Sequence, residues 1–582
     1  MRINTLFFCL AFLMAAPLWS QGSLLPLGNP AYHTLRRMDV LSENQSEIHT
    51  ALRGYLRGSI VSYTKSLDST FSATALDELD YQFIFLDNND WLLDFDFPTT
   101  LGGPRMTSKD LQNQLQGAPY WQESKKPFLK HFYKTPAHFF EVNEPGFSLR
   151  LNPMLNLQYG NLVDDPAPYF LNQRGIELRG SIDDRIHFYT NIIESQARFP
   201  NYASRFINTY RALPGNGFYK TNFGSDILNF SDGYDFLNSQ AYLAFNVTPH
   251  VGVQFGNGRH FIGDGIRSML LSDFSNNYLY LQLNWKVWKL HFQNIFAELN
   301  STSAQNVTGN GLVPKKYMAA HYLSLQLHKN LQFGLFETVI FSRENQFELQ
   351  YLNPVILYRT IEQSVGSPDN VLIGLNLKWN AWNKFQVYSQ FILDEFKFSE
   401  LVVNQDGWWG NKYGFQLGIF APNLAGVDHL DVQVEYNTAR PYTYTHFDSV
   451  ANYTHYNMPL SHPLGANFKE TIALVKYQPF PRWYLELRYS HIDYGGDVNG
   501  LNYGRDWRRS YNSRILEYGN ETGQGLATSI DLLHFDLSFN LAHNVFLDLR
   551  YLYRSEANTG ELNTQYISTG IRVNMARRYD AF

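Results

Sequence analysis

After Phe147, most of the chain consists of short stretches in which apolar and polar residues strictly alternate. In Tyr278–Val287, the odd positions from 279 to 287 hold Leu, Leu, Leu, Trp and Val, and the even positions between them hold Tyr, Gln, Asn and Lys. Successive side chains on a strand point to opposite faces of the sheet. The pattern therefore predicts a strand with one apolar and one polar face.

Eighteen such segments recur along the chain. They lie near residues 147–159, 175–182, 186–195, 239–247, 251–257, 277–285, 288–299, 319–328, 331–341, 371–379, 385–395, 412–421, 427–437, 468–478, 482–492, 529–541, 545–554 and 564–575. Every second gap is short, as at Asp183–Arg185 and Lys329–Asn330, whereas the intervening gaps, such as Gln196–Asn238 and Thr438–Asn467, are long. Bacterial outer-membrane barrels combine an even strand number with short periplasmic turns and long external loops, and closure leaves no unpaired strand edge in hydrocarbon. The pattern predicts an all-β transmembrane barrel of about 18 antiparallel strands.

Tryptophan placement supports this prediction. Trp285, Trp288, Trp379, Trp382 and Trp483 all lie beside predicted short turns. Membrane barrels carry aromatic girdles at both lipid–water interfaces, whereas in a soluble β protein the same residues would belong to a core. We therefore expect the barrel to sit in outer-membrane lipid, with its long loops facing the cell exterior.

The composition fits a barrel and excludes other classes. Aromatic residues make up 16% of the chain, charged residues 17%, and the mean hydropathy is −0.31. This is too polar for a helical membrane protein, but a barrel needs apolar side chains only at alternate positions. The formal net charge of −6 creates no field that attracts nucleic acid, so no nucleic-acid partner is expected.

The first part of the chain has a different pattern. Residues 1–20 predict a secretory signal peptide, in which Arg2 supplies the positive start and Leu6–Leu18 an apolar core too short to span a bilayer as a helix. Cys9, the only cysteine, lies within it, so the processed chain should carry no disulfide and no cysteine-bound metal. Residues 21–140 lack the alternation and predict a small periplasmic helical segment that caps or plugs a barrel formed by residues 141–582. A loosely attached periplasmic domain is the alternative.

Three helices are predicted in this segment. Apolar residues recur at helical spacing from Ile48 to Tyr63, and positions 32, 35 and 38 predict a second helix. Thr74-x-x-Asp77 has the form of a capping box at the start of a third. Helices of this length are marginal alone, so we expect them to pack against the barrel mouth.

Four sequence motifs carry a family resemblance. In order, they are Arg174-Gly175-x-Glu177-x-Arg179-Gly180, then Gly256-x-Gly258-Arg259-His260-Phe261-x-Gly263-x-Gly265-x-Arg267, then Tyr351-x-Asn353-Pro354-Val355-x-x-Tyr358-Arg359 with Gly366-Ser367-Pro368-Asp369-Asn370, and finally Glu435-Tyr436-Asn437-x-Ala439-Arg440-Pro441-Tyr442-x-Tyr444. Together they resemble the Wzi-like capsule assembly family, in particular its Bacteroidetes branch, which is often labelled gliding motility protein RemB. The resemblance implies an outer-membrane barrel of eighteen strands with a helical bundle at its periplasmic end. It also implies association with surface polysaccharide or, for the branch with the gliding label, with motile surface adhesins.

The predicted outside loops are rich in residues that suit sugars. Flat aromatic faces contact sugar C–H surfaces, planar polar groups hydrogen-bond hydroxyls, and arginine forks bind uronate carboxylates. The candidate polysaccharide-binding residues are Trp408, Trp409, Arg440, Tyr442, Tyr444, Tyr453, Tyr456, Trp507 and Arg508. For each of them, packing within the loops is the alternative role.

The Gly-rich run from Gly256 to Gly265 is not a phosphate-binding loop, because it lacks the following Lys-Ser/Thr and does not open a helix. It favours a tight loop that folds into the lumen and is held by charged side chains, with ligand or ion binding as the alternative. The predicted lumen and loop polar network comprises Arg259, His260, Asp264, Arg267, Asp273, Asn353, Arg359, Asp369 and Asn370.

The sequence gives little support for a catalytic function. It contains no His-Glu-x-x-His or Gly-x-Ser-x-Gly motif, and the histidines at 446, 455 and 462 match no metal-ligand spacing. We therefore predict no enzyme activity, cofactor or metal. The leading hypothesis is a non-catalytic outer-membrane protein that binds or organises capsular polysaccharide or exopolysaccharide at the cell surface. The alternatives are a cell-surface adhesin of the gliding apparatus, with gliding-machinery or export proteins as partners, and a passive porin.

Overall fold

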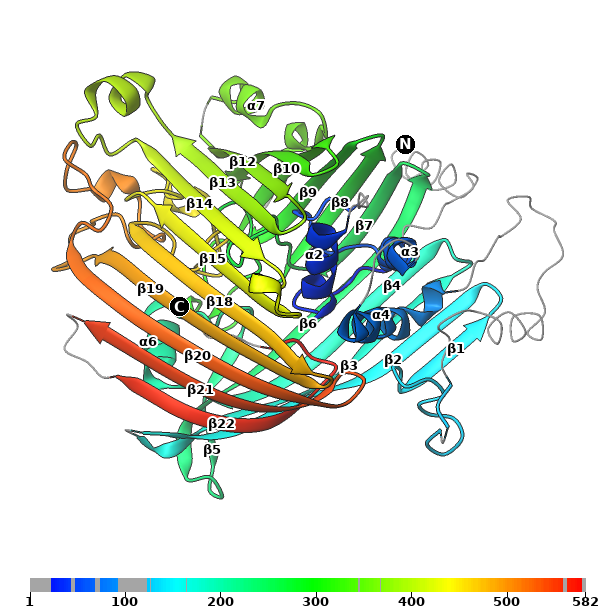
Figure 1. Ribbon diagram of the computed structural model, residues 1–582. Coiled ribbons are helices and arrows are strands. Elements are labelled where there is room, and N and C mark those ends of the chain that lie inside the picture. Colours follow the sequence, from blue (N-terminus) through cyan, green and yellow to red (C-terminus); the bar gives the residue numbers. More distant parts are fainter. Residues whose placement is uncertain are drawn as a thin grey trace.

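The computed structural model describes residues 22–42, 48–68, 74–92, 123–125, 127–163, 165–343, 346–366, 368–557 and 563–577. The predicted signal peptide, residues 1–20, lies outside the described residues. Twenty strands form one antiparallel sheet, and eighteen of them close into a barrel (Figure 1). The first and last barrel strands pair directly, from Leu155 with Val573 to Leu162 with Tyr566. The predicted fold class is confirmed.

All eighteen predicted segments are strands of the barrel. They are β2 (Phe147–Leu162), β3 (Asp165–Ile182), β4 (Ile186–Arg198), β6 (Phe230–Thr248), β7 (Val251–Gly258), β8 (Tyr278–Val287), β9 (Leu290–Asn300), β10 (Lys315–His328), β11 (Leu331–Phe341), β12 (Asn370–Ala381), β13 (Phe385–Glu395), β14 (Lys412–Ala421), β15 (Leu430–Ala439), β18 (Phe468–Phe480), β19 (Trp483–Gly496), β20 (Leu526–Ala542), β21 (Val545–Ala557) and β22 (Thr564–Val573). Outside the ring, β1 (Phe140–Glu144) pairs with the start of β2, and β5 (Tyr219–Ser225) pairs with β6. A short ribbon of β16 (Thr454–His455) and β17 (Met458–Pro459) lies within one long loop.

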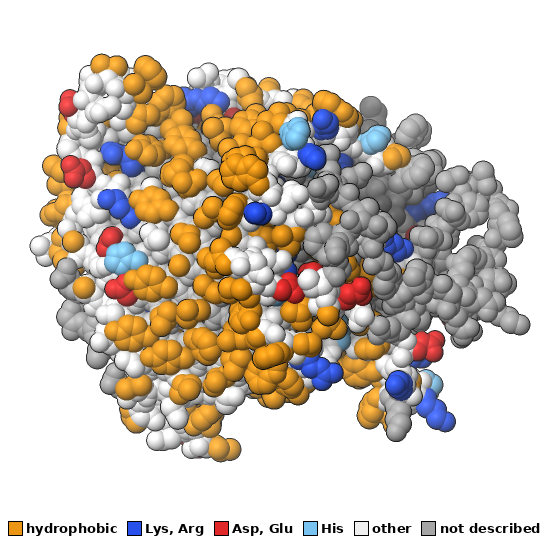
Figure 2. Space-filling model, viewed as in Figure 1, with side chains coloured by type: hydrophobic (Ala, Val, Ile, Leu, Met, Phe, Trp, Pro, Cys, Tyr) orange, Lys and Arg blue, Asp and Glu red, His pale blue; other side chains and the backbone are white. Residues whose placement is uncertain are grey.

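The outer wall of the barrel is apolar. On β12, Ile373, Leu375, Leu377 and Trp379 face outward and are 41–45% exposed, and hydrophobic side chains spread across the visible wall (Figure 2). Trp288, in a short turn, is 80% exposed, as expected of a side chain in an interfacial girdle. Of the helices in the described part of the chain, none is both long enough and apolar enough to cross a bilayer.

Among the described residues, three N-terminal helices lie in the barrel mouth at the short-turn end: α2 (Ala31–Leu41), α3 (Arg57–Asp68) and α4 (Ala75–Asp87) (Figure 1). Helix α2 is tied to the inner wall by an ion pair between the Lys378 ammonium and Asp39, at 2.7 Å. The predicted capping box is present at the start of α4, where Thr74 and Asp77 bond reciprocally.

One of the three predicted helices starts later than expected. The apolar spacing from Ile48 predicted a helix there, but α3 begins only at Arg57. Leu52 and Leu56 instead form single β-bridges, to Ile262 and Leu24. Tertiary contacts with the chain inside the barrel therefore override the local helical pattern.

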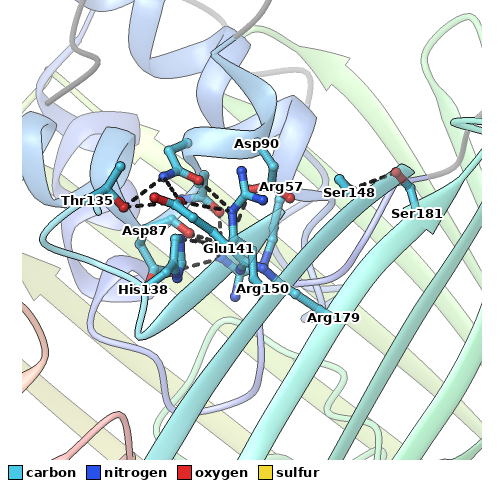
Figure 3. A network of polar contacts seen from close by, with 12 residues as sticks. Arg57, Asp87, Asp90, Thr135, His138, Glu141, Ser148, Arg150, Arg179 and Ser181 are labelled. Carbon is cyan, nitrogen blue, oxygen red and sulfur yellow. Dashed lines mark hydrogen bonds and ion pairs between the residues drawn. The ribbon is translucent and has the colours of Figure 1, made fainter. Parts of the chain in front are cut away.

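A buried polar network joins these helices to the wall (Figure 3). Arg179, on β3, donates to the carbonyl oxygen of Asp87 at 2.6 Å and pairs with Asp90 at 3.3 Å. Arg57 pairs with Asp87 at 2.9 Å. Burial opposes ionisation of Asp87, but the Arg57 guanidinium holds the pKa of this carboxyl well below its usual range. The network therefore remains charged at neutral pH and fixes the helices inside the mouth.

Removing one arginine of this network should release the helices. Arg179 is 1% exposed, and breaking a buried ion pair from one side costs about 3–5 kcal/mol because the other charge stays uncompensated. We expect Arg179→Ala to make the segment 22–92 sensitive to limited proteolysis in membranes while the barrel stays intact. The matched control on the same strand is Arg174→Ala, whose pair with Glu194 is half exposed on both sides. Equal protection of both variants would contradict the anchoring role.

Candidate functional site

The loop between β7 and β8, residues 259–277, runs into the barrel instead of away from it; we call it the inward loop. Two glycines permit its close approach to the opposite wall. Gly263 has φ +147°, and a Cβ at Gly265 would lie 2.6 Å from Glu435 Oε2. A side chain at either position would therefore strain the inward loop or displace the wall side chains that hold it.

Polar side chains of the opposite wall hold the inward loop. The Glu435 carboxylate accepts the backbone N–H groups of Ile266 and Arg267 at 2.7 and 3.0 Å. The Arg267 guanidinium pairs with Glu470 at 3.0 Å, and Gln390 accepts the N–H of Met269 at 2.8 Å. The inward loop therefore spans the lumen from β7 and β8 to β13, β15 and β18.

The other predicted network residues of this loop lie nearby. Asp264 accepts from the Thr50 hydroxyl at 2.6 Å, which links the loop to the N-terminal segment. Arg259 donates to the backbone carbonyl of Asp273 at 3.0 Å. Both ring nitrogens of His260 have partners, the Tyr278 hydroxyl and Gln282. Burial lowers the pKa of His260 to about 4, so the ring is neutral at neutral pH.

The remaining four network residues do not join this group. Asn353, Arg359 and Asp369 lie in the loop between β11 and β12, where Arg359 pairs with Glu362 and Asp369 with Arg343. Much of this loop packs on outward-facing wall residues, including Val339 and Phe341. Asn370, at the start of β12, instead points inward and donates to the carbonyl of Ala451 at 3.0 Å.

A second loop, residues 440–467 between β15 and β18, is buried over the inward loop. The hydroxyls of Tyr444 and Tyr453 donate to the carbonyls of Met269 and Leu270 at 2.9 and 2.8 Å. The Tyr442 hydroxyl donates to the carbonyl of Asn502 at 2.9 Å. All three tyrosines are at most 1% exposed. As the structure places them, they brace the loops against one another.

Trp507 is also part of the packed interior. It is 1% exposed, its indole N–H donates to the carbonyl of Asn457 at 2.7 Å, and its ring stacks on Tyr210 at the end of α6 (Asn201–Tyr210), with 4.5 Å between centroids. Arg508 lies over the same Tyr210 ring at 4.6 Å and pairs with Asp506 at 2.8 Å. Tyr456 is half-buried near this group.

Arg440 ties three loops together. Its guanidinium donates to the carbonyls of Asn411 and Asn520 at 2.8 and 3.1 Å, and more distantly to that of Trp408 at 3.5 Å. These partners belong to the β13–β14 and β19–β20 loops, whereas Arg440 itself follows β15. Arg440 therefore fixes how the loops lie beside one another.

Two candidates, Trp408 and Trp409, join three residues of another loop in a compact group, the surface aromatic cluster, comprising Trp408, Trp409, Tyr511, Arg514 and Glu517. Trp408 is half-buried, whereas Trp409 is only 8% exposed. Both indole N–H groups point to Glu517 Oε1, at 2.8 Å from Trp409 and 3.4 Å from Trp408. Arg514 lies 4.1 Å above the Trp409 ring and pairs with Glu517 at 2.7 Å. The hydrogen bond from Arg514 lowers the pKa of Glu517, which keeps this exposed carboxylate ionised.

The surface aromatic cluster combines residues from two loops. Trp408 and Trp409 precede β14, and the other three members lie in the β19–β20 loop. Arg514 and Glu517 were not predicted as site residues, because neither stands in a recognisable motif. Their only sequence signal is their place in a loop rich in Tyr and Arg. The cluster offers a half-buried indole face beside an arginine–carboxylate pair.

The lumen retains a cavity beside the inward loop. A cavity of ≈770 Å³ lies between the N-terminal helices, the inward loop and the wall, where Glu177, Asn191, Arg488 and Arg572 are among its lining residues. The wall residues that line this cavity are mostly polar, as in other barrels with an aqueous interior.

Comparison with known proteins assigns the chain to a family. The family model for capsule assembly protein Wzi matches residues 172–559, well over half of the chain. The chain belongs to the Wzi capsule assembly family. The family part of the resemblance found in the sequence is thereby confirmed, and this Wzi family member is an outer-membrane β-barrel.

One solved structure supports the fold, and two others align more weakly. Wzi from Escherichia coli, described as an outer membrane protein involved in group 1 capsule assembly and as a carbohydrate-binding β-barrel, aligns with TM-score 0.56 at 11% identity, covering 96% of this chain and 100% of that chain. OprD from Pseudomonas aeruginosa aligns with TM-score 0.39 at 10% identity, covering 73% of this chain and 94% of that chain. OccAB4 from Acinetobacter baumannii gives TM-score 0.40 at 9% identity, with coverages of 73% and 97%. Comparison with curated protein sequences gives no match.

Proposed function

We propose that this Wzi family member binds and organises capsular polysaccharide or exopolysaccharide at the cell surface without catalysing a reaction. The surface aromatic cluster is the observation that carries the proposal. It lies at the long-loop end of the barrel, opposite the N-terminal helices. In the proposal, this end faces the cell exterior and the helical segment lies in the periplasm, after removal of a signal peptide.

The chemistry of the cluster suits a sugar polymer. The Trp408 face can contact the C–H surface of a pyranose ring. Glu517 and Arg514 offer an acceptor and a donor fork that match vicinal hydroxyls, and the arginine also suits an acidic sugar. A repetitive polymer engages many copies of such a site at once, so modest affinity at each copy suffices for retention.

Polysaccharide retention on the purified protein tests this function. Surface polysaccharide from the native cells, passed over detergent-solubilised protein on a column, should be retained, while an unrelated soluble glucan should elute freely. Absence of retention would contradict the proposal.

A deletion strain separates the proposed function from a role in gliding, the role suggested by the label of the family branch. Loss of the capsule layer with normal colony spreading supports the polysaccharide role. Normal capsule with lost spreading would favour an adhesin of the gliding apparatus instead.

A further inference from the structure

Three polar side chains stand on the outward face of the wall, where neighbouring positions are apolar. They are Asn294 on β9, His321 on β10 and Glu337 on β11, which lie at register positions opposite one another. The residues that alternate with them, such as Ile295 and Phe336, belong to the lumen core. All three polar side chains are buried, with 0%, 7% and 8% exposure. On a bare lipid-facing wall such groups would be strongly unfavourable.

The loop between β11 and β12 covers them. Its described residues 346–366, which we call the strap, include the single-turn η3 (Leu349–Leu352) and α7 (Tyr358–Ser364), and α7 lies outside the barrel over these strands (Figure 1). Tyr351, Tyr358 and Ile361 pack on outward-facing wall residues. The strap is therefore bound to the outer side of the barrel.

The polar wall residues satisfy the backbone of the strap. The Glu337 carboxylate accepts the N–H groups of Tyr358 and Arg359 at 2.9 and 3.1 Å. The Asn294 amide donates to the carbonyl of Pro354 at 2.9 Å. Irregular backbone is tolerated at membrane depth only where protein groups replace water as partners. The wall supplies these partners.

The contact at Pro354 lies deep. Asn294 is four positions beyond Leu290, the first residue of β9, which directly follows a short turn. With a rise of about 3.3 Å per residue and a strand tilt of about 40°, Asn294 stands about 10 Å above that turn, within an apolar band about 25 Å tall. The middle of the strap therefore reaches hydrocarbon depth.

The side of the strap that faces away from the barrel carries large apolar side chains beside exposed polar ones such as Gln350 and Arg359. Leu349, Val355 and Leu357 are 72%, 77% and 67% exposed. They continue the apolar surface of β12, where Ile373 and Leu375 face outward. We propose that the strap is embedded in the bilayer against β9–β12, and that these three side chains contact lipid acyl chains.

A single introduced cysteine tests the proposal. The only native cysteine, Cys9, lies in the predicted signal peptide, so a chain made with a cysteine-free signal can carry a fluorescent label at Val355→Cys alone. In phosphatidylcholine vesicles, we expect blue-shifted emission and strong quenching by lipids with a nitroxide on the acyl chain. The matched control is Leu312→Cys, which is 91% exposed in the β9–β10 loop and should show neither effect. A label at 355 with the emission and quenching of the control would overturn the proposal.

Two further outcomes are decisive. Disulfide-linked dimers of unlabelled Val355→Cys, together with a label shielded from lipid in the separately labelled protein, would place a second copy of the chain on the strap and overturn lipid contact. Glu337→Leu removes the acceptor of two strap N–H groups, so we expect new tryptic cleavage at Arg359 in vesicles. Glu194→Leu, which removes an outward carboxylate on β4 far from the strap, should leave Arg359 protected; equal cleavage in both variants would contradict fixation by Glu337.

Discussion

Trp408→Ala combined with Glu517→Gln should abolish most polysaccharide retention while the barrel folds normally. The first change removes the half-buried indole face of Trp408, and the second removes the charge that holds both the indoles and Arg514. Truncating an aromatic anchor in a binding site typically costs about 2 kcal/mol, or about thirtyfold in affinity. Multivalent binding magnifies such a loss along a polymer. Retention on a polysaccharide column, with heat-modifiable mobility as the measure of folding, checks the prediction.

Trp288→Ala is the matched control for this experiment. Trp288 is a tryptophan that is even more exposed, at 80%, but it lies in the turn between β8 and β9 at the opposite end of the barrel. We expect this variant to retain polysaccharide like the unchanged protein. If the double variant also retains the polymer fully, the surface aromatic cluster is not the binding site, whatever the rest of the long loops contributes.

The sequence predicted the wall of the barrel because the wall obeys a local rule. Each strand has one face toward lipid and one toward the lumen, so its alternation is visible without knowledge of its neighbours. The region around Leu52 has no such rule. There, Leu52 forms a β-bridge to the inward loop and Leu56 forms one to Leu24, because packing inside the barrel outweighs weak helical propensity.

The candidate site was less predictable, because the composition of a loop does not show which of its side chains are buried. Tyr444 and Trp408 both lie in long, aromatic loops, but Tyr444 is fully buried, whereas Trp408 is half-exposed. Tyr444 is buried because its hydroxyl contacts the inward loop, which crosses the lumen beneath it. The two segments are more than a hundred residues apart in the sequence, so no local pattern reveals this contact. Glu337 did leave a local signal, a carboxylate at an outward position of an alternating strand. A carboxylate that interrupts the apolar outward face predicts that another segment of the chain shields it from lipid, although the sequence does not say which segment does so.

The inward loop should control whether the barrel conducts ions. Barrels of 16–18 strands leave an aqueous channel unless chain fills it, and here residues 262–271 bridge the lumen to β13, β15 and β18 while supporting the Tyr444 and Tyr453 hydroxyls. Deleting 262–271 removes the bridge and also the acceptors of both tyrosines. We therefore expect a several-fold rise in single-channel conductance across a planar bilayer relative to the unchanged protein.

A point substitution tests, without shortening the chain, whether the inward loop blocks ion flow through the lumen. In Gly265→Leu, the new Cβ would meet Glu435 and Gln416 oxygens at 2.6 and 2.7 Å and the backbone oxygen of Arg267 at 2.8 Å. Either those side chains or the inward loop must move, and we expect the loop to lose its contact with Glu435 and expose a water-filled path. Gly496→Leu is the matched control, because a Cβ there meets only ordinary contacts of 3.6–3.9 Å. An open channel in Gly265→Leu but not in Gly496→Leu would show that contact with Glu435 keeps the lumen closed. High conductance of the unchanged protein would instead favour the porin alternative. The inward loop would then not block the lumen, although it is hydrogen-bonded to the opposite wall.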